Sequence, residues 1–376
     1  MSSEPVLWSR EDHTRAKHVL LLAFFNKWVS IHSESFAKRG VRGLVRIYDG
    51  FAGPGVYSDG AEGSPLIVLR ALLTNENLAG RWARVRYQLQ FVEKNAARAR
   101  RLEAELTRLH AELVGHEVSA MDQVTWTVTC GTYEANVPPT VREPSALFLF
   151  LDPFGYSHAP MTLTQDLVQQ PKSDTLIFAP FSFVNRFLGR DGQAAPMDRF
   201  FGTSEWRAVP DGPGRPQRLL ELFENQLRLA GMDWVGSFRL KPDEANAYYI
   251  VGGSAHLRGW ASIKEGFWAV DPVHGKEFRT VRGAAPTEQL FPTEDLEPDK
   301  ADTLGLEAEL RASLGTDWFS VEDAIDVTAR SRWLDSHLKR ATLAPAERAK
   351  RLEVIRPTGA RQFKEGRGIR LRFVPS

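Results

Sequence analysis

The chain has 376 residues, of which 43% are hydrophobic and 25% charged, a composition typical of a soluble globular protein with roughly two or three domains. Its one cysteine, Cys130, excludes an internal disulfide and a zinc site built from cysteine pairs, and we expect it to be a small buried residue in a reducing compartment. Charges interrupt the N-terminal segment, and no run of about eighteen apolar residues occurs. We therefore expect no signal peptide, no membrane association and a cytoplasmic location.

The net charge of +1 hides an uneven distribution of charge along the chain. Residues 331–376 contain 12 Lys and Arg against 4 Asp and Glu, which gives +8 and leaves −7 for residues 1–330. A basic C-terminal segment on a mildly acidic body indicates a module that meets polyanions, because Lys and Arg displace counterions from phosphates. A solvated cationic surface without such a partner explains the same charge equally well.

Strand and helix patterns alternate through the first half of the chain. Short apolar runs predict strands at residues 44–48, 87–92, 124–129, 146–151 and 175–179. Apolar residues at helical spacing predict helices at 14–30, 64–73 and 95–113, the second with Ser64 as N-cap and Pro65 in its first turn. This alternation predicts an α/β fold, a doubly wound, parallel, Rossmann-like sheet with helices on both faces.

The second half of the chain predicts the end of that sheet, a linker and a small basic domain. A helix at 218–230 and paired strands at 234–240 and 248–252 complete a domain of residues 1–281. Prolines and acidic residues without apolar periodicity predict a linker at 282–300. Residues 301–376 predict a winged-helix domain with three helices and two strands. The helices are expected at 304–314, from Ser320 with Asp323 as its capping partner, and from Trp333, and the strands at 352–355 and 369–373.

The loop at residues 49–55 follows the first predicted strand and has the sequence Asp-Gly-Phe-Ala-Gly-Pro-Gly. In open parallel sheets, ligands bind beyond the carboxyl ends of the strands. Gly53 and Gly55 allow the main chain to turn tightly and to present amide groups to a carboxylate or phosphate. The alternative interpretation is a tight turn after a core strand.

Glu93 ends the second predicted strand, one strand, one loop and one helix after Asp49. An acid at this position in dinucleotide-binding folds accepts hydrogen bonds from ribose hydroxyls, which favours a nucleoside contact here. An exposed strand-end carboxylate followed by Lys94 is the alternative.

The most specific feature is the sequence Asp152-Pro153-Phe154-Gly155, which follows the apolar run of the fourth predicted strand. It places a carboxylate, a rigid turn and an aromatic ring at the mouth of the sheet. The ring can stack on a flat substrate while the acid accepts hydrogen bonds from an amino group, such as the exocyclic amine of a nucleobase. These contacts orient the nitrogen lone pair toward an electrophilic methyl group. An ordinary strand-end turn is the alternative.

Other polar residues are weaker candidates. His13, His18 and His32 have no carboxylate or cysteine cluster at ligand spacing, so we predict no metal site. Asn185 and Arg186 follow the fifth predicted strand, where a contact with a substrate phosphate and a structural role as helix cap or ion-pair partner are equally compatible with the sequence.

Together these residues resemble a class I S-adenosylmethionine-dependent methyltransferase. Residues 49–55 look like the family's Asp-x-Phe-x-Gly-x-Gly motif, which receives the methionine part of the cofactor, and Glu93 looks like its ribose-binding acid. The resemblance implies S-adenosylmethionine as cofactor, with contacts from Asp49, Phe51, Gly53, Gly55, Glu93, Thr132, Tyr133 and Asp152.

The sequence at residues 152–155 is similar to the Asp-Pro-Pro-Tyr motif of enzymes that methylate exocyclic amines, and closer still to the Asp-Pro-Phe-Gly of tRNA guanine-N2 methyltransferases. The resemblance implies catalytic roles for Asp152, Pro153 and Phe154. Because Gly155 replaces the aromatic residue of the commoner motif, Phe154 or Tyr156 must supply the stacking ring.

A narrower resemblance, to the three-Cys-motif partner protein family, covers roughly residues 8–278. It is carried by His13, Lys17, His18 and residues 48–55, 62–66, 152–156, 185–187 and 201–203. Longer members of this family add a winged-helix tail, and members are often encoded beside a radical-type protein with three cysteines, which implies such a protein as a partner.

These inferences predict an S-adenosylmethionine-dependent N-methyltransferase that acts on an exocyclic amine of a base in RNA or DNA. The expected substrate contacts are Tyr156, Asn185 and Arg186 near the cleft and Lys339, Arg340, Arg348, Lys350, Arg361, Lys364 and Arg367 on the phosphates. Two alternatives stay open: a methyltransferase that acts on a small metabolite or peptide with a partner enzyme, and a non-catalytic, nucleotide-sensing regulator that binds DNA.

Overall fold

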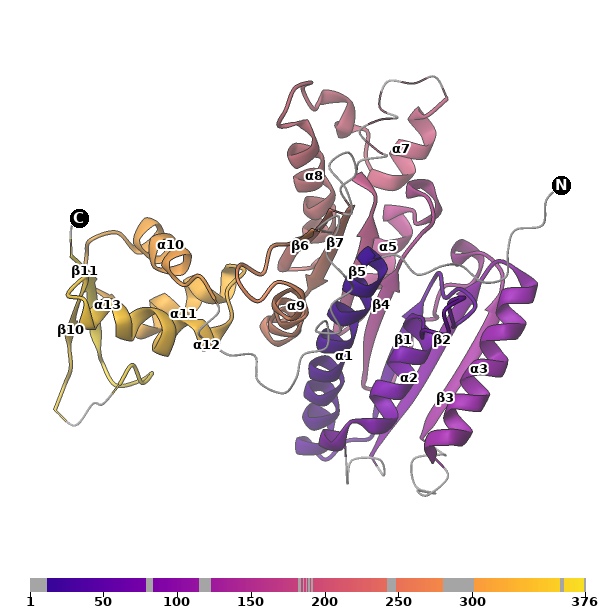
Figure 1. The fold of residues 1–376 in the computed structure, drawn as a ribbon, viewed down its shortest axis with the longest axis horizontal. Helices are drawn as coiled ribbons and strands as arrows, with labels where there is room; N and C mark the ends of the chain where they lie inside the picture. Colours follow the sequence, from indigo (N-terminus) through magenta and orange to yellow (C-terminus); the bar gives the residue numbers. More distant parts are fainter. Residues whose placement is uncertain are drawn as a thin grey trace. The chain divides into compact units, whose positions relative to one another are not determined.

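The computed structural model describes residues 12–78, 84–114, 123–181, 184, 186, 188, 190, 192–241, 248–279, 301–358 and 362–374. The chain forms two compact units (Figure 1), of which the first comprises Met1–Gly266 and Phe278–Ala285 and the second Phe267–Glu277 and Pro286–Ser376. The linker expected at residues 282–300 lies outside the described residues. No helix in the described part of the chain has the length and apolar character needed to cross a bilayer.

A mixed sheet of eight described strands has the order β3-β2-β1-β4-β5-β7-β6-β8. Its strands are β1 (Gly43–Asp49), β2 (Val85–Glu93), β3 (Val124–Cys130), β4 (Ser145–Leu151), β5 (Ser173–Ala179), β6 (Trp234–Lys241), β7 (Tyr248–Ser254) and β8 (Glu277–Arg279). Strands β1 to β5 pair in parallel, whereas β7 is antiparallel to both β5 and β6. Because the chain order reverses between β1 and β4, the carboxyl ends of these strands flank the switch point of the sheet, where ligands bind in open α/β folds.

Helices cover both faces of this sheet, as predicted (Figure 1). Alternate residues of β4 show the two faces: Leu147, Leu149 and Leu151 share one core with α5 (Met161–Val168), α7 (Ala194–Phe201) and α8 (Arg215–Leu229). Phe148 points to the other face, where its ring centroid lies 4.7 Å from Phe24 and 5.6 Å from Trp28 of α1 (Asp12–Lys38). The helix α2 (Ser64–Thr74) packs beside α1, and α3 (Ala96–Val114) packs beside α2.

The helices α5, α7 and α9 (Leu257–Val270) and the strand β8 were not predicted. In α9 the helical pattern is weakened by Gly259 and Gly266, which are required for close packing. A Cβ atom on Gly259 would lie 2.1 Å from the carboxylate of Asp174, and one on Gly266 would lie 2.9 Å from the backbone oxygen of Leu20. The expectation of a buried Cys130 is wrong, because this last residue of β3 is exposed at the end of an outer strand.

The second unit combines short helices with a small antiparallel sheet. The helices are α10 (Leu304–Leu314), α11 (Val321–Arg330), α12 (Asp335–Leu338), a π-helical turn (Lys339–Leu343) and α13 (Ala344–Arg348). The three strands have the order β10 (Leu352–Ile355), β11 (Arg370–Phe373) and β9 (Phe319–Ser320). The predicted capping box of α11 is present, because Ser320 Oγ accepts from the amide of Asp323 while the Asp323 carboxylate accepts from the amide of Ser320. The two-residue strand β9 is too short to give a sequence pattern.

Candidate functional site

The glycine-rich loop after β1 is held by the carboxylate of Asp49. This side chain is 2% exposed, and it accepts hydrogen bonds from the amide of Phe51 at 3.0 Å and from the hydroxyl of Ser64 at 2.7 Å. Ser64 was predicted to cap α2, but Gly63 is the N-cap and no side chain caps the helix. The Ser64 hydroxyl is instead used to bind Asp49, which ties the start of α2 to the end of β1.

Burial changes the acid–base behaviour of Asp49. Removal from water is the main cause that raises the pKa of its carboxyl group to about 7, and the negative charges of Asp152 and Glu93 act in the same direction. The hydrogen bonds from Ser64 and Phe51 oppose this rise. Asp49 therefore changes its charge close to neutral pH.

The loop itself needs its glycines. Gly53 and Gly55 have φ angles of 66° and 82°, a conformation that glycine adopts without strain. A Cβ atom on Gly55 would also lie 2.7 Å from Leu66 and 2.8 Å from Leu102. The backbone at this turn is therefore compatible only with glycine, as the sequence predicted.

At the end of β4, Asp152 forms an ion pair with Lys17 of α1. The Lys17 Nζ atom donates to Asp152 Oδ2 at 2.5 Å, and it lies 4.4 Å from the ring centroid of Phe178 at the end of β5. Lys17 is buried, whereas the Asp152 side chain is 27% exposed. The second carboxylate oxygen of Asp152 can therefore accept a hydrogen bond from a ligand while Lys17 holds the first.

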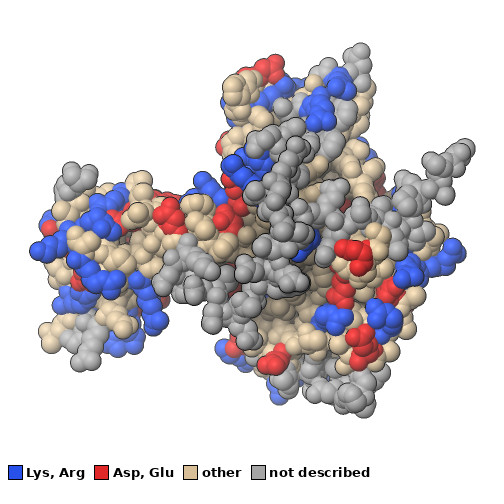
Figure 2. Space-filling model, in the orientation of Figure 1, with Lys and Arg blue, Asp and Glu red and all other residues tan. Residues whose placement is uncertain are grey.

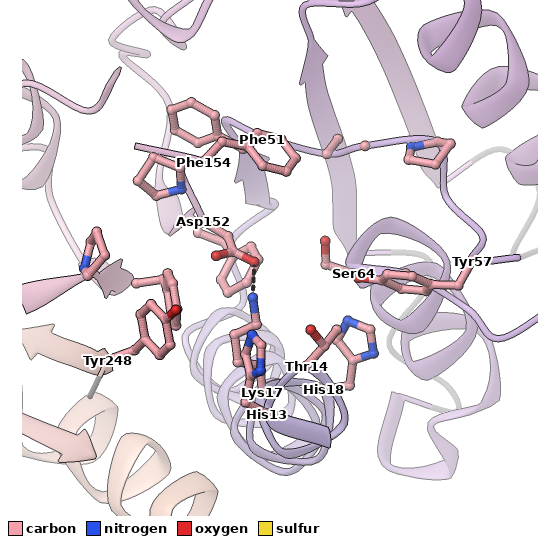
Figure 3. A pocket seen from close by; sticks show the side chains of 18 of the residues that line it. His13, Thr14, Lys17, His18, Phe51, Tyr57, Ser64, Asp152, Phe154 and Tyr248 are labelled. Carbon is pink, nitrogen blue, oxygen red and sulfur yellow. Dashed lines mark hydrogen bonds and ion pairs between the residues drawn. The ribbon is translucent and has the colours of Figure 1, made fainter. Parts of the chain in front are cut away.

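These groups border a cavity of about 810 Å³ beyond the ends of β1 and β4. Figure 3 shows Lys17 reaching from α1 toward Asp152, with Tyr248 on one side of this pair and Ser64 and Tyr57 on the other. The lining residues come from the start of α1, the loop after β1, the start of α2, the turn after β4 and the strands β5 and β7. They are His13, Thr14, Lys17, His18, residues 51–57, Gly63, Ser64, Phe150, residues 152–156, Phe178, Pro180 and Tyr248.

Aromatic rings form much of the cavity wall. Tyr248 stacks between His13 and Phe178, with ring centroids 5.5 Å and 5.2 Å away. Phe154 lines the cavity and is 68% exposed, so its ring is accessible to a flat ligand. Tyr156 also lines the cavity, and its hydroxyl donates to the side-chain oxygen of Gln193.

Three predicted cofactor residues do not line this cavity. Glu93 is 4% exposed, and its carboxylate accepts from the amide of Asn95 at 2.7 Å. Thr132 is exposed before the short helical turn at Tyr133–Ala135. Tyr133 is buried in the sheet core, where its ring lies 5.8 Å from Phe51. The structure thus brings Phe51, Gly53, Gly55 and Asp152 to the cavity and keeps Asp49 directly behind the loop, while the other three do not line the cavity wall.

The remaining predicted residues divide between the two units. Arg186 is exposed and does not line the cavity, and Asn185 lies outside the described residues. In the second unit, Arg340, Lys364 and Arg367 are exposed, while Lys339 pairs with Glu365 at 2.6 Å. Arg361 lies outside the described residues. No group of metal-ligating side chains occurs in the described ranges.

Several lining residues had no predicted role in binding or catalysis, chiefly Lys17, Ser64, Tyr57, Phe178 and Tyr248. Lys17 is separated from Asp152 by 135 positions, so no local pattern connects them. The positions of Phe178 and Tyr248 at or near strand ends could have indicated them as lining residues, because such positions face the ligand-binding edge of an open sheet.

The fold and the cavity define an open α/β protein with a ligand-sized site at the switch point of its sheet. No protein-family model matches the chain, and no curated protein matches it.

Several solved structures that resemble part of the chain are methyltransferases by name. Precorrin-6y C5,15-methyltransferase from Geobacter metallireducens is 12% identical over 59% of this chain and 86% of that chain, with a TM-score of 0.27. A SAM-dependent methyltransferase from Aquifex aeolicus is 13% identical over 59% and 88%, also with a TM-score of 0.27. The CMeT domain of the citrinin polyketide synthase is 14% identical over 57% and 46%, with a TM-score of 0.28. Likenesses of this size do not assign a function to the chain.

Proposed function

We propose that this chain is an S-adenosylmethionine-dependent N-methyltransferase that acts on an exocyclic amine of a base in RNA or DNA. The observation that carries the proposal is that the Gly53–Gly55 turn and the residues Asp152 and Phe154 line one cavity at the switch point of the sheet. The part of the cavity at the Gly53–Gly55 turn suits a nucleotide-like cofactor, and the part at Asp152 and Phe154 suits a flat amine.

The residues around the glycine-rich turn fit the cofactor. The cavity of about 810 Å³ lies within the usual range for ligands of this size. The glycine turn and Ser64, the first residue of α2, offer amide donors to a carboxylate, aided by the positive end of the helix dipole. A bound S-adenosylmethionine would supply an electrophilic methyl group for transfer to an acceptor nitrogen.

The other part of the cavity holds the acceptor. The outer carboxylate oxygen of Asp152 accepts a hydrogen bond from the amine, and Phe154 stacks on the base. Lys17 keeps Asp152 in place through the 2.5 Å ion pair. These residues work by orientation of the nitrogen lone pair rather than by strong base catalysis.

The second unit would bind the RNA or DNA. We assign it as a winged-helix-like module, since its short helices are combined with a three-stranded sheet. In Figure 2, Lys and Arg side chains gather on the surface of the part that starts at α10. The exposed cations Arg340, Lys364 and Arg367 would contact phosphates, with affinity that falls steeply as salt rises. A protein with three cysteines is the proposed partner.

The test is direct detection of the product. The full chain is incubated with S-adenosylmethionine and total RNA in one reaction, and with S-adenosylmethionine and total DNA in another. In each reaction S-adenosylhomocysteine is quantified and methylated nucleosides are identified by mass. We expect a methyl group on an exocyclic nitrogen of one base. Cofactor binding without turnover on any nucleic acid would contradict the proposal.

A small metabolite is a second candidate acceptor. The observation in its favour is Lys17, whose ammonium group is paired with Asp152 at the cavity wall and has further N–H donors for an anionic small molecule. Formation of S-adenosylhomocysteine with a metabolite extract, but not with nucleic acid, would select this candidate.

A further inference from the structure

The three-stranded sheet of the second unit has one buried and one open face. Leu352, Phe319, Leu371 and Phe373 belong to the core of the unit. The alternate residues Glu353, Ile355, Arg370 and Arg372 point the other way, and the pairing places Arg372 opposite Glu353 and Arg370 opposite Ile355. Ile355 is 53% exposed, so this outer face presents apolar as well as cationic groups to solvent.

Trp318 adds an aromatic ring to that outer face. It immediately precedes β9, and its ring centroid lies 4.7 Å from the guanidinium carbon of Arg372 and 5.6 Å from that of Arg370. Arg372 also donates two hydrogen bonds to Glu353, at 2.5 and 3.1 Å, which restrain its side chain. Trp318 is only partly buried, while Arg370 is exposed.

This combination suits the bases of a single strand. An aromatic ring and planar guanidinium groups stack on base faces, and the arginine charges attract phosphates. In a duplex the base faces are covered by their neighbours, so they cannot reach such a surface without unstacking.

We infer that the outer face formed by Trp318, Arg370, Arg372 and Ile355 is a stacking platform for unpaired nucleotides. This inference rests on the proposed binding of nucleic acid, and it goes further because it states that single-stranded substrate is preferred over duplex. The platform is distinct from the phosphate contacts proposed for Arg340, Lys364 and Arg367.

The experiment uses the full chain and fluorescently labelled oligonucleotides of about 12 nucleotides. Binding by anisotropy is compared, at one salt concentration, for single-stranded RNA, single-stranded DNA and the matching duplex. The variants are Trp318→Leu, which removes stacking, Trp318→Phe, which keeps it, and Arg370→Gln. Arg330→Gln is the charge-matched control, because Arg330 is exposed and pairs with Asp326 on α11.

We expect Trp318→Leu to weaken single-strand binding roughly tenfold or more, because stacking contributes about 1–3 kcal/mol per base. Trp318→Phe should retain most of the affinity, Arg370→Gln should weaken single-strand binding more than Arg330→Gln does, and duplex binding should not respond to Trp318→Leu. The RNA and DNA arms then show which polymer the platform prefers. Thermal unfolding of each variant separates loss of the platform from loss of the fold.

Two results would overturn the inference in different ways. If the duplex binds as well as the single strand, or if Trp318→Leu binds like the original chain, the platform is wrong while nucleic-acid binding stands. If no oligonucleotide binds at all, the proposed nucleic-acid function fails together with the platform.

Discussion

The ends of the neighbouring strands β1 and β4 each carry an aspartate, and the two are satisfied in opposite ways. Asp49 is almost fully buried and is bound by a hydroxyl and an amide, both neutral. Asp152 is partly exposed in the cavity and is bound by the ammonium group of Lys17. Burial raises the pKa of Asp49, whose carboxyl group organises a loop, whereas the partial exposure of Asp152 lets its side chain face a ligand.

The strongest test of this difference is removal of the carboxylate that faces the cavity. We expect Asp152→Ala to lower methyl transfer by about a hundredfold or more, because the amine loses the group that orients it. Calorimetry should show that the variant still binds S-adenosylmethionine, because the glycine-rich turn is unchanged. The control Asp211→Ala removes an aspartate that is 88% exposed and should leave turnover unchanged. Full turnover by Asp152→Ala would contradict the mechanism in which Asp152 positions the amine.

Removal of the buried aspartate should act on structure first. Asp49→Ala leaves the Ser64 hydroxyl and the Phe51 amide without their partner, so the free energy of unfolding should fall by about 2–4 kcal/mol. Affinity for S-adenosylmethionine should fall with it, because the glycine-rich loop loses its anchor. Chemical denaturation and calorimetry measure the two effects. An Asp49→Ala chain as stable as the original would show that the anchor has no structural role.

Substitution of Lys17 tests the cationic partner of Asp152. Lys17→Met leaves Asp152 without a charged partner, and we expect kcat/KM to fall by about tenfold because the carboxylate is no longer held. Lys17→Arg keeps the charge and should recover part of this loss. Steady-state kinetics with a defined acceptor measure both. Equal activity of the Met and Arg variants would mean that the ion pair does not position Asp152.

The raised pKa of Asp49 also predicts a pH dependence of stability. Its pKa is about 7 in the folded chain against an ordinary value of 3.8, so the folded state holds a proton that the unfolded state releases between these values. The contribution of Asp49 is therefore complete below pH 3.8 and is lost as the pH rises to about 7. Asp49→Asn imitates the protonated group, so the melting temperature of the original chain should fall relative to this variant across that range. A constant difference would contradict the raised pKa.

Local sequence patterns predicted much of this fold, and the reasons for the misses are physical. The strands β1 to β5 and the glycine loop were predictable because apolar runs and glycine turns depend on near neighbours. Ser64 was misassigned as a cap, since its hydroxyl is taken by Asp49 from another element. Lys17 was missed for the same reason, because its partner lies 135 positions away. The cofactor contacts of Glu93, Thr132 and Tyr133 stay predictions: these residues lie at or just after strand ends, but they do not line the cavity.

The helix α1 has a consequence for how the protein is made. Its first turns line the cavity through Lys17, and its middle packs on Phe148 through Phe24 and Trp28, so the earliest helix depends on a strand synthesised more than a hundred residues later. Contacts of such long range form late during synthesis. A nascent chain that has not yet extended past β4 therefore carries α1 without the ring that covers its aromatic face, and the cavity is completed only when β4 joins the sheet.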